Sequence, residues 1–231
     1  MKLNSILPLL SAVLLASACC SSRYTAADVN LAAIDQFAFF QPYAFITGYD
    51  AHNKAYHDAV DSRTEANMIR GIIESERFPF TDVIPVDYED ANTDDLRWVA
   101  NFPEVDPKKI DRLRVPKDFR NMLDESGCRY GVVIYARGFI RSKEALQREE
   151  TLRAVSRVLD KIIENNTGVY RATNYNTVSA PYGNDMFMAV IDGETDRVVY
   201  FVKEISPFYS HPVVRNDVNA LVHKLLKDFI R

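Results

Sequence analysis

Apolar residues form several short runs whose spacing predicts a β-sheet. The clearest run covers residues 130–140, Tyr-Gly-Val-Val-Ile-Tyr-Ala-Arg-Gly-Phe-Ile, and is almost continuously apolar, as in a strand buried on both faces. Two further runs, 186–192 and 197–205, are separated by a turn that begins with Asp192 and Gly193. An Asp-Gly pair between such runs is a strong hairpin signal. The second half of the chain therefore contains a central strand and a hairpin.

The first half of the chain carries weaker strand signals. Aromatic and β-branched residues dominate 34–40, and the pattern resumes after Pro42. Because proline cannot donate to a β-ladder, we expect the part after Pro42 to lie at a sheet edge. A further short strand is predicted at 80–86, followed by an acidic loop at 87–95 that we interpret as a solvated turn.

Apolar residues at intervals of three and four predict four helices, over 58–76, 117–126, 142–165 and 213–230. In the first, Ser62 and Glu65 have the spacing of a capping box. Gly127 caps the second. The third has the best pattern, with its apolar residues on one stripe: Leu152, Val155, Leu159, Ile162 and Ile163. Charged residues of both signs separate them, which is typical of a helix with one packed face and one solvated face.

This order of elements predicts an α/β (α+β) fold. We expect a mixed sheet of about five strands with helices packed on it, and a C-terminal hairpin followed by an amphipathic helix. Residues 31–231 form one domain in this interpretation, because that length suits a single core. The polar segment 169–184 is a long loop, and long loops often form contact surfaces.

The first 20 residues have the organisation of an export signal. Lys2 precedes an apolar run at 6–15, and small residues at 16–18 lead into Cys19. The run is shorter than the roughly 20 apolar residues that a membrane-spanning helix needs. We therefore expect the segment to be removed rather than to remain as a transmembrane helix.

This segment resembles the lipobox of bacterial lipoproteins, in which a leucine and two small residues precede an invariant cysteine. Ala16 stands where the family usually has leucine, and Leu15 lies one place earlier. The resemblance implies a lipoprotein signal peptide at 1–18, lipidation of Cys19 by fatty acyl chains such as palmitate, and a lipidated tether at 19–30. Cys20 is the alternative acceptor.

In the lipoproteins that the segment resembles, the residues after the lipidated cysteine indicate whether the protein stays in the inner membrane or moves to the outer membrane. No acidic residue follows directly, so the implied place is the outer membrane, on the face toward the periplasm. Two or three acyl chains would anchor the protein durably, since a single chain gives only reversible binding.

Charge and cysteine content exclude several classes of function. Removal of Lys2 with the signal leaves 27 basic against 32 acidic residues, with no basic cluster, so nucleic acid is not an expected partner. Cys128 is the one cysteine outside the processing site, and we interpret it as a small core residue. No internal disulfide is available unless Cys20 pairs with it.

A search for catalytic and metal motifs assigns no such residue. His52, His57 and Asp61 are the only clustered metal candidates, and they lack the paired-histidine spacing of zinc sites, so we interpret them as surface residues. We find no serine elbow, no activated cysteine and no glycine-rich phosphate loop. We therefore predict no catalytic residue, no cofactor and no metal, while paired carboxylates stay open because sequence does not show spatial pairs.

The element order, the central strand at 130–136 and the hairpin at 186–201 resemble a broad group of envelope lipoproteins. The group includes the curli-secretion lipoprotein, the amino-terminal domain of the Tol-system propeller protein and the penicillin-binding-protein activator lipoproteins. The resemblance implies a non-enzymatic docking or assembly component of the cell envelope, held on the membrane by its lipid and bound to an envelope protein. A homo-oligomer is left open.

The alternative is a periplasmic small-molecule or glycan binder or hydrolase. Aromatic and acidic residues at 43–56 and 170–182 would then form its site.

Overall fold

The computed structural model describes residues 21–76, 78–86, 88, 94–167, 180–206 and 209–229. The predicted signal peptide, both candidate lipidation cysteines and most of the predicted loop at 169–184 lie outside these ranges. No helix among the described residues combines the length and apolar composition that crossing a bilayer requires.

The described chain forms the predicted mixed α/β fold, but its sheet has eight strands rather than about five. Their order is β1-β8-β7-β6-β2-β5, while β3 pairs with β6 and β4 pairs with β3. Pro42 accounts for part of the difference, because it divides the early aromatic run into two strands. The bounds are β1 Ser21–Thr25, β2 Phe37–Phe40, β3 Tyr43–Tyr49, β4 Ala55–His57, β5 Phe80–Ile84, β6 Tyr130–Arg141, β7 Tyr182–Asp192 and β8 Arg197–Ile205.

Strand β6 lies at the centre of the sheet. Along one side it pairs antiparallel with β7, from Tyr130 opposite Asp192 to Ile140 opposite Tyr182. Along the other side β2 is parallel to the beginning of β6 and β3 is parallel to its end. Both sides of this strand are thus paired, which agrees with its continuous apolar sequence.

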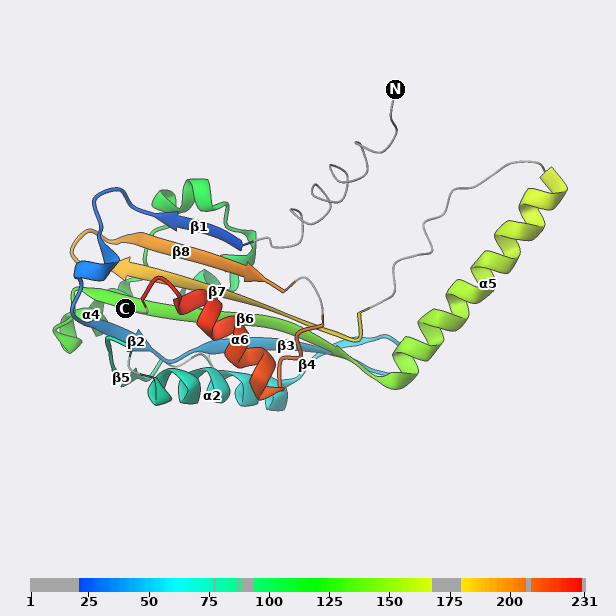
Figure 1. Cartoon of the computed structure of the whole chain (residues 1–231), viewed down its shortest axis with the longest axis horizontal. Coiled ribbons are helices and arrows are strands. Elements are labelled where there is room, and N and C mark those ends of the chain that lie inside the picture. Colours follow the sequence, from blue (N-terminus) through cyan, green and yellow to red (C-terminus); the bar gives the residue numbers. More distant parts are fainter. Residues whose placement is uncertain are drawn as a thin grey trace, which may run out of the picture.

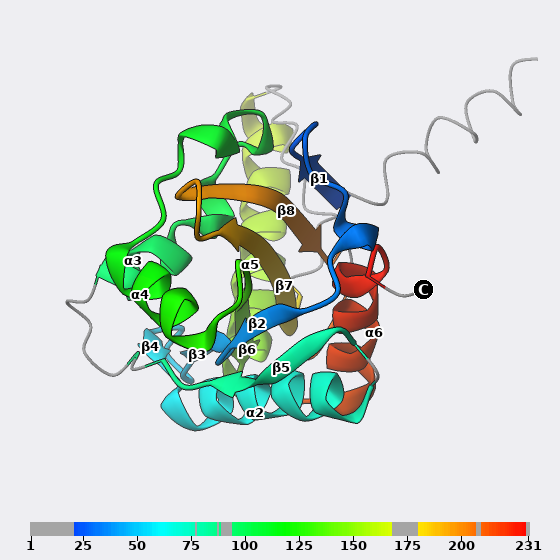
Figure 2. The same ribbon diagram turned by 90° about the vertical axis from the view of Figure 1, so that its left-hand side faces the viewer.

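Helices cover both faces of the sheet (Figures 1 and 2). Helices α2 and α6 enclose one apolar core, and α3, α4 and two short 3-10 helices enclose the other. Side chains alternate between the two cores along β2, where Phe37 and Phe39 enter the first and Phe40 enters the second. The bounds are α2 Ala59–Ser75, α3 Asp94–Ala100, α4 Lys117–Ser126, α5 Lys143–Thr167, α6 Arg215–Leu226, and the 3-10 helices η2 Leu31–Ala33, η3 Phe102–Glu104 and η4 Pro107–Arg112.

The capping box predicted from Ser62 and Glu65 is wrong. The N-cap of α2 is Asp58, whose carboxylate accepts a hydrogen bond from the Asp61 backbone N–H at 3.0 Å. Ser62 and Glu65 are instead buried inside the helix. Serine and aspartate are both favourable N-cap residues. Asp58 takes this position, four residues before Ser62.

Residues 21–25 belong to the sheet, although the sequence predicted a tether through residue 30. They form edge strand β1, antiparallel to the end of β8. Arg23 fixes this strand through ion pairs with Glu204 at 2.9 Å and Asp228 at 2.5 Å. A polar strand of five residues has no hydrophobic period, so its sequence gave no strand signal.

Helix α5 does not pack on the sheet as its apolar stripe predicted. It begins beside the end of β6 and projects away from the domain (Figure 1). Leu152, Val155 and Val158 are 60%, 50% and 59% exposed. The apolar cores on both faces of the sheet are already covered by other helices, so the described part of α5 does not pack on them.

Burial predicts very different costs for two apolar residues of α2. We expect Ile69→Ala, at a fully buried position, to lower the free energy of unfolding by about 2–5 kcal/mol because it leaves a cavity between helix and sheet. Val60→Ala, at a position that is 71% exposed, should change it by less than about 0.5 kcal/mol. Urea unfolding measures both, and equal costs would contradict the placement of α2.

Candidate functional site

One end of the sheet carries both the projecting helix and a pocket. Strand β6 ends at Arg141, and Ser142 starts α5 by accepting a hydrogen bond from the Ala145 backbone N–H at 3.1 Å. The Ser142 backbone N–H donates to the carbonyl of Tyr49 at 3.0 Å, which ties the start of the helix to β3. The first turn of α5 is therefore fixed on the sheet.

An ionic network holds the next turns of α5. Glu149 accepts from Arg141 at 2.5 Å and from Arg153 at 2.8 Å. The Arg141 guanidinium also lies 5.3 Å from the centre of the Tyr49 ring, a cation–π distance. These contacts define the direction in which α5 leaves the domain.

Beyond this network three apolar side chains of α5, Leu152, Val155 and Val158, are at least half exposed. Leu152, Val155 and Val158 lie three residues apart and share one side of the helix. Exposed apolar side chains that cluster on one face mark an interaction surface, whereas single ones do not. Leu152 and Val155 belong to the stripe predicted from the sequence and are exposed instead of buried, while the side chains of Leu159, Ile162 and Ile163 lie outside the described part of the structure.

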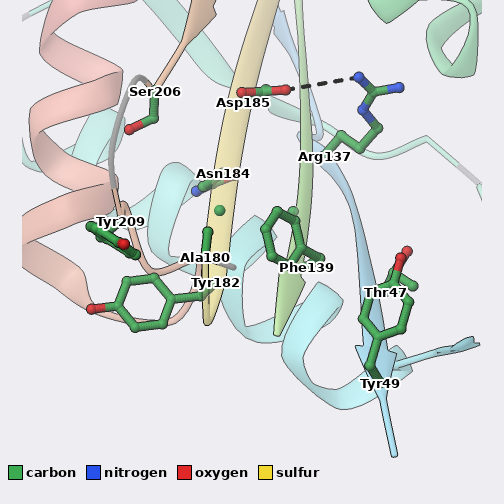
Figure 3. A pocket seen from close by; sticks show the side chains of 12 residues that line it. Thr47, Tyr49, Arg137, Phe139, Ala180, Tyr182, Asn184, Asp185, Ser206 and Tyr209 are labelled. Carbon is green, nitrogen blue, oxygen red and sulfur yellow. Dashed lines mark ion pairs between the residues drawn. The ribbon is translucent and has the colours of Figure 1, made fainter. Parts of the chain in front are cut away.

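A pocket of about 530 Å³ opens at the base of α5 (Figure 3). Strands β3, β6 and β7 and the segment after β8 supply its walls. Its lining combines aromatic rings with polar and charged groups: Thr47, Tyr49, Arg137, Gly138, Phe139, Ala180, Tyr182, Gly183, Asn184, Asp185, Ser206 and Tyr209.

A glycine on β7 shapes the wall beside Phe139. Gly183 pairs with Phe139 across the β6–β7 ladder. A Cβ atom at Gly183 would lie 2.5 Å from the Phe139 ring, closer than such atoms approach. The missing side chain therefore lets the ring lie against the β7 backbone.

One ion pair lines the pocket. Arg137 lies 3.8 Å from Asp185, and on its other side 3.6 Å from Glu104. Burial raises the pKa of the Asp185 carboxyl, and the Arg137 charge opposes that rise. The pocket therefore contains a carboxyl group that is partly buried from solvent.

Behind the pocket wall, Asn184 contacts a buried carboxyl group. The Asn184 amide donates to Glu65 Oε1. In the described part of the chain, Glu65 Oε2 and Asn184 Oδ1 have no hydrogen-bond partner. Burial raises the pKa of Glu65 to about 8. Both atoms without a partner are oxygens that only accept when Glu65 is ionised, whereas a protonated Oε2 is a donor. Together with the raised pKa, this leads us to infer that Glu65 is neutral at pH 7.

The structure brings together one part of each of the two segments, 43–56 and 170–182, proposed as a ligand site. Tyr49 and Tyr182 line the same pocket, while 170–179 lie outside the described residues. Tyr43 lies in a different pocket of about 620 Å³ between β3 and α2, together with Phe45, His57 and Tyr88. Arg137 and Asp185 were missed because they occupy strands and belong to no motif.

The three metal candidates lie in separate settings. His52 contacts Arg148 at 3.0 Å, and the His57 ring stacks on Phe45 at 4.5 Å. Asp61 follows the N-cap of α2. Among the residues that the structure describes, no three histidine, cysteine or acidic side chains are grouped as metal ligands would be.

The contact between His57 and Ser62 does not activate the serine hydroxyl as a nucleophile. The Ser62 hydroxyl donates to the Asp58 carbonyl at 2.6 Å and accepts from the Ile46 N–H at 2.8 Å. His57 Nε2 lies 3.2 Å from the same oxygen. The only hydroxyl proton is already engaged, so the serine links α2 to β3.

Cys128, a free and half-buried thiol, packs against the second core.

Comparison with known proteins does not show a family for this chain. No family model and no curated protein matches. Among solved structures, the PelC dodecamer from Paraburkholderia phytofirmans is 10% identical, with a TM-score of 0.38 and coverage of 91% of this chain and 96% of that one. A DUF4136 family protein from Bacteroides thetaiotaomicron is 6% identical, with a TM-score of 0.35 and coverage of 91% and 95%. The envelope lipoprotein groups that the sequence resembles are not confirmed.

The Glu65–Asn184 pair predicts a pH-dependent stability. An unfolded glutamate titrates near 4.5 and the folded Glu65 near 8, so the folded chain keeps a proton that the unfolded chain releases between these values. The free energy of unfolding should therefore fall as pH rises from about 4.5 to about 8. Glu65→Gln should remove this contribution, because the amide oxygen still accepts from Asn184 but the side chain does not titrate.

Urea unfolding at several pH values measures the difference between variant and parent. Glu74→Gln is the matched control, since Glu74 lies on the same helix but is exposed. If Glu65→Gln leaves the pH dependence unchanged, the neutral state of Glu65 is wrong.

Proposed function

We propose that this protein is a membrane-anchored envelope lipoprotein that acts as a non-enzymatic docking or assembly component. Helix α5 is the element that binds the partner. The observation that carries the proposal is the exposed apolar stripe of α5, on a helix that projects from an otherwise covered sheet (Figure 1).

The length and face of α5 suit a helix that docks in a groove. Its 25 residues span about 37 Å. In the sequence, Leu152, Val155 and Leu159 recur at the i, i+3, i+7 spacing by which an amphipathic helix anchors in an apolar groove. Removing a side chain such as Leu from water contributes about 1.5–3 kcal/mol, so a few of them suffice for specific binding. The chemistry of the partner is therefore an apolar groove or helix on an envelope protein.

The proposed lipid lies at the same end of the sheet as this helix. Strand β1 starts at Ser21, opposite Glu204 near the end of β8, and Ile205 pairs with Asp185 of the pocket. From Cys19 to Ser21 the chain spans at most about 7 Å. If Cys19 is acylated, the membrane is close to the pocket and to the start of α5, on the periplasmic face of the outer membrane.

Substitution of the acceptor cysteine tests the anchor. We expect Cys19→Ala to move the protein from the membrane fraction to the soluble fraction and to abolish metabolic labelling with a palmitate analogue. Cys20→Ala should leave both unchanged. The reverse pattern would identify Cys20 as the acceptor, and labelling of neither would contradict the lipoprotein assignment.

Substitution on the stripe tests docking. We expect Leu152→Glu to abolish in-cell crosslinking to the envelope partner, because a charge on the stripe cannot enter an apolar groove without a large desolvation cost. The melting temperature should stay within about 2 °C of the parent, since Leu152 makes no core contact.

The control for this substitution is Val60→Glu, which places the same charge on an exposed apolar position of α2. Mass spectrometry of the crosslinked products identifies the partner. Crosslinks that survive Leu152→Glu, or that disappear equally with Val60→Glu, would contradict the role of α5.

A further inference from the structure

The pocket at the base of α5 has aromatic rings on opposing sides (Figure 3). Tyr182 and Tyr209 form an edge-to-face pair with ring centres 6.0 Å apart. Tyr49 and Phe139 form a second such pair, at 6.4 Å. Figure 3 shows Tyr182 and Tyr209 on one side of the pocket and Tyr49 on the other, with Phe139 between them. The rings offer flat apolar surfaces at several orientations.

Polar groups close one end of the same pocket. Arg137 and Asp185 face each other there (Figure 3). Asn184 lies next to Asp185 on β7 and is only 2% exposed. Its side chain points to the opposite face of the sheet, where it binds Glu65 of α2 behind the pocket wall. The site therefore offers a carboxylate and a guanidinium close together.

The charge balance of the pocket argues for a neutral ligand. The positive charge of Arg137 is offset by Asp185, and Glu104 lies on its outer side. A phosphate or carboxylate ligand would need cationic groups in excess. A fatty acyl chain would need a continuous apolar lining, which the charged pair interrupts.

We infer that this pocket binds a carbohydrate. The C–H faces of a pyranose ring are apolar and stack on aromatic rings, while its hydroxyl groups both donate and accept hydrogen bonds. Asp185 accepts from such hydroxyls and Arg137 donates to them. The volume of about 530 Å³ lies within the range of small-ligand sites and holds a mono- or disaccharide.

Two features prepare the pocket before any ligand binds. Gly183 lets the Phe139 ring lie flat against β7. The contact of Asn184 with Glu65 ties β7 to α2 behind the pocket wall. Rigid polar and aromatic groups on paired strands bind with less loss of entropy than groups on loose segments. This inference does not depend on docking through α5, because no pocket residue belongs to that helix.

Calorimetric titration of the purified full-length protein tests the inference. The detergent must lack a sugar headgroup, so an amine oxide is suitable. The probes are chitobiose, cellobiose and maltose, with sorbitol as an open-chain polyol and inorganic phosphate as an anion. We expect at least one disaccharide to bind with a millimolar or lower dissociation constant, and sorbitol and phosphate not to bind.

Variants locate the binding. Asp185→Asn and Tyr182→Ala should each weaken disaccharide binding at least tenfold. Asp185→Asn is almost isosteric, so it remains informative if Tyr182→Ala folds poorly. Leu152→Glu should bind disaccharide like the parent, which separates failure of the pocket from failure of docking. Absence of binding to all three disaccharides, binding of phosphate instead, or affinity unchanged by Asp185→Asn would overturn the inference.

Discussion

The pairing of β6 on both sides is the constraint on which the other features depend. Eleven of its twelve residues form an antiparallel ladder with β7, and the strand forms two shorter parallel ladders with β2 and β3. The side chains of residues 132–136 are apolar on both faces of this strand, and each face therefore requires helices to cover it. The two cores, one under α2 and α6 and the other under α3 and α4, follow from this requirement.

Complete coverage of the sheet also explains the position of α5. Strand β6 continues past the covered region to Arg141, where the pocket lies and where α5 begins. The apolar cores on both faces are already covered by α2, α3, α4 and α6, so the described part of α5 does not pack on them. The same geometry thus produces an exposed helix face and, beside it, a pocket between the ends of three strands.

The sequence predicted the elements that local patterns determine. A continuous apolar run identified β6, the Asp192-Gly193 pair identified the hairpin of β7 and β8, and apolar periodicity identified α6. Pairings between distant segments were not predictable, because nothing local specifies that β2 and β3 share one side of β6. Strand β1 was missed since edge pairing with β8 needs only backbone groups and the ion pairs of Arg23.

The candidate site was predictable in part. Tyr49 and Tyr182 were expected near a ligand because they belong to the aromatic and acidic segments 43–56 and 170–182, and the structure places both in one pocket. Asp185 and Arg137 carried no signal, as charged residues in strands usually face solvent. The pair of Glu65 and Asn184 joins residues 119 positions apart, which no spacing rule detects. The stripe of α5 was visible in the sequence, but periodicity alone does not distinguish packing within a chain from packing between chains.

Hydrogen exchange of the α5 backbone tests the central claim, that this helix is presented by the domain to a partner. In the purified protein, amides around Leu152 to Val158 should exchange faster than those of α2, because no tertiary packing protects them. In native membranes, where the partner is present, the same amides should become protected while α2 is unchanged. Equal protection of α5 and α2 in the purified monomer would show that α5 packs on its own domain, and would contradict the account.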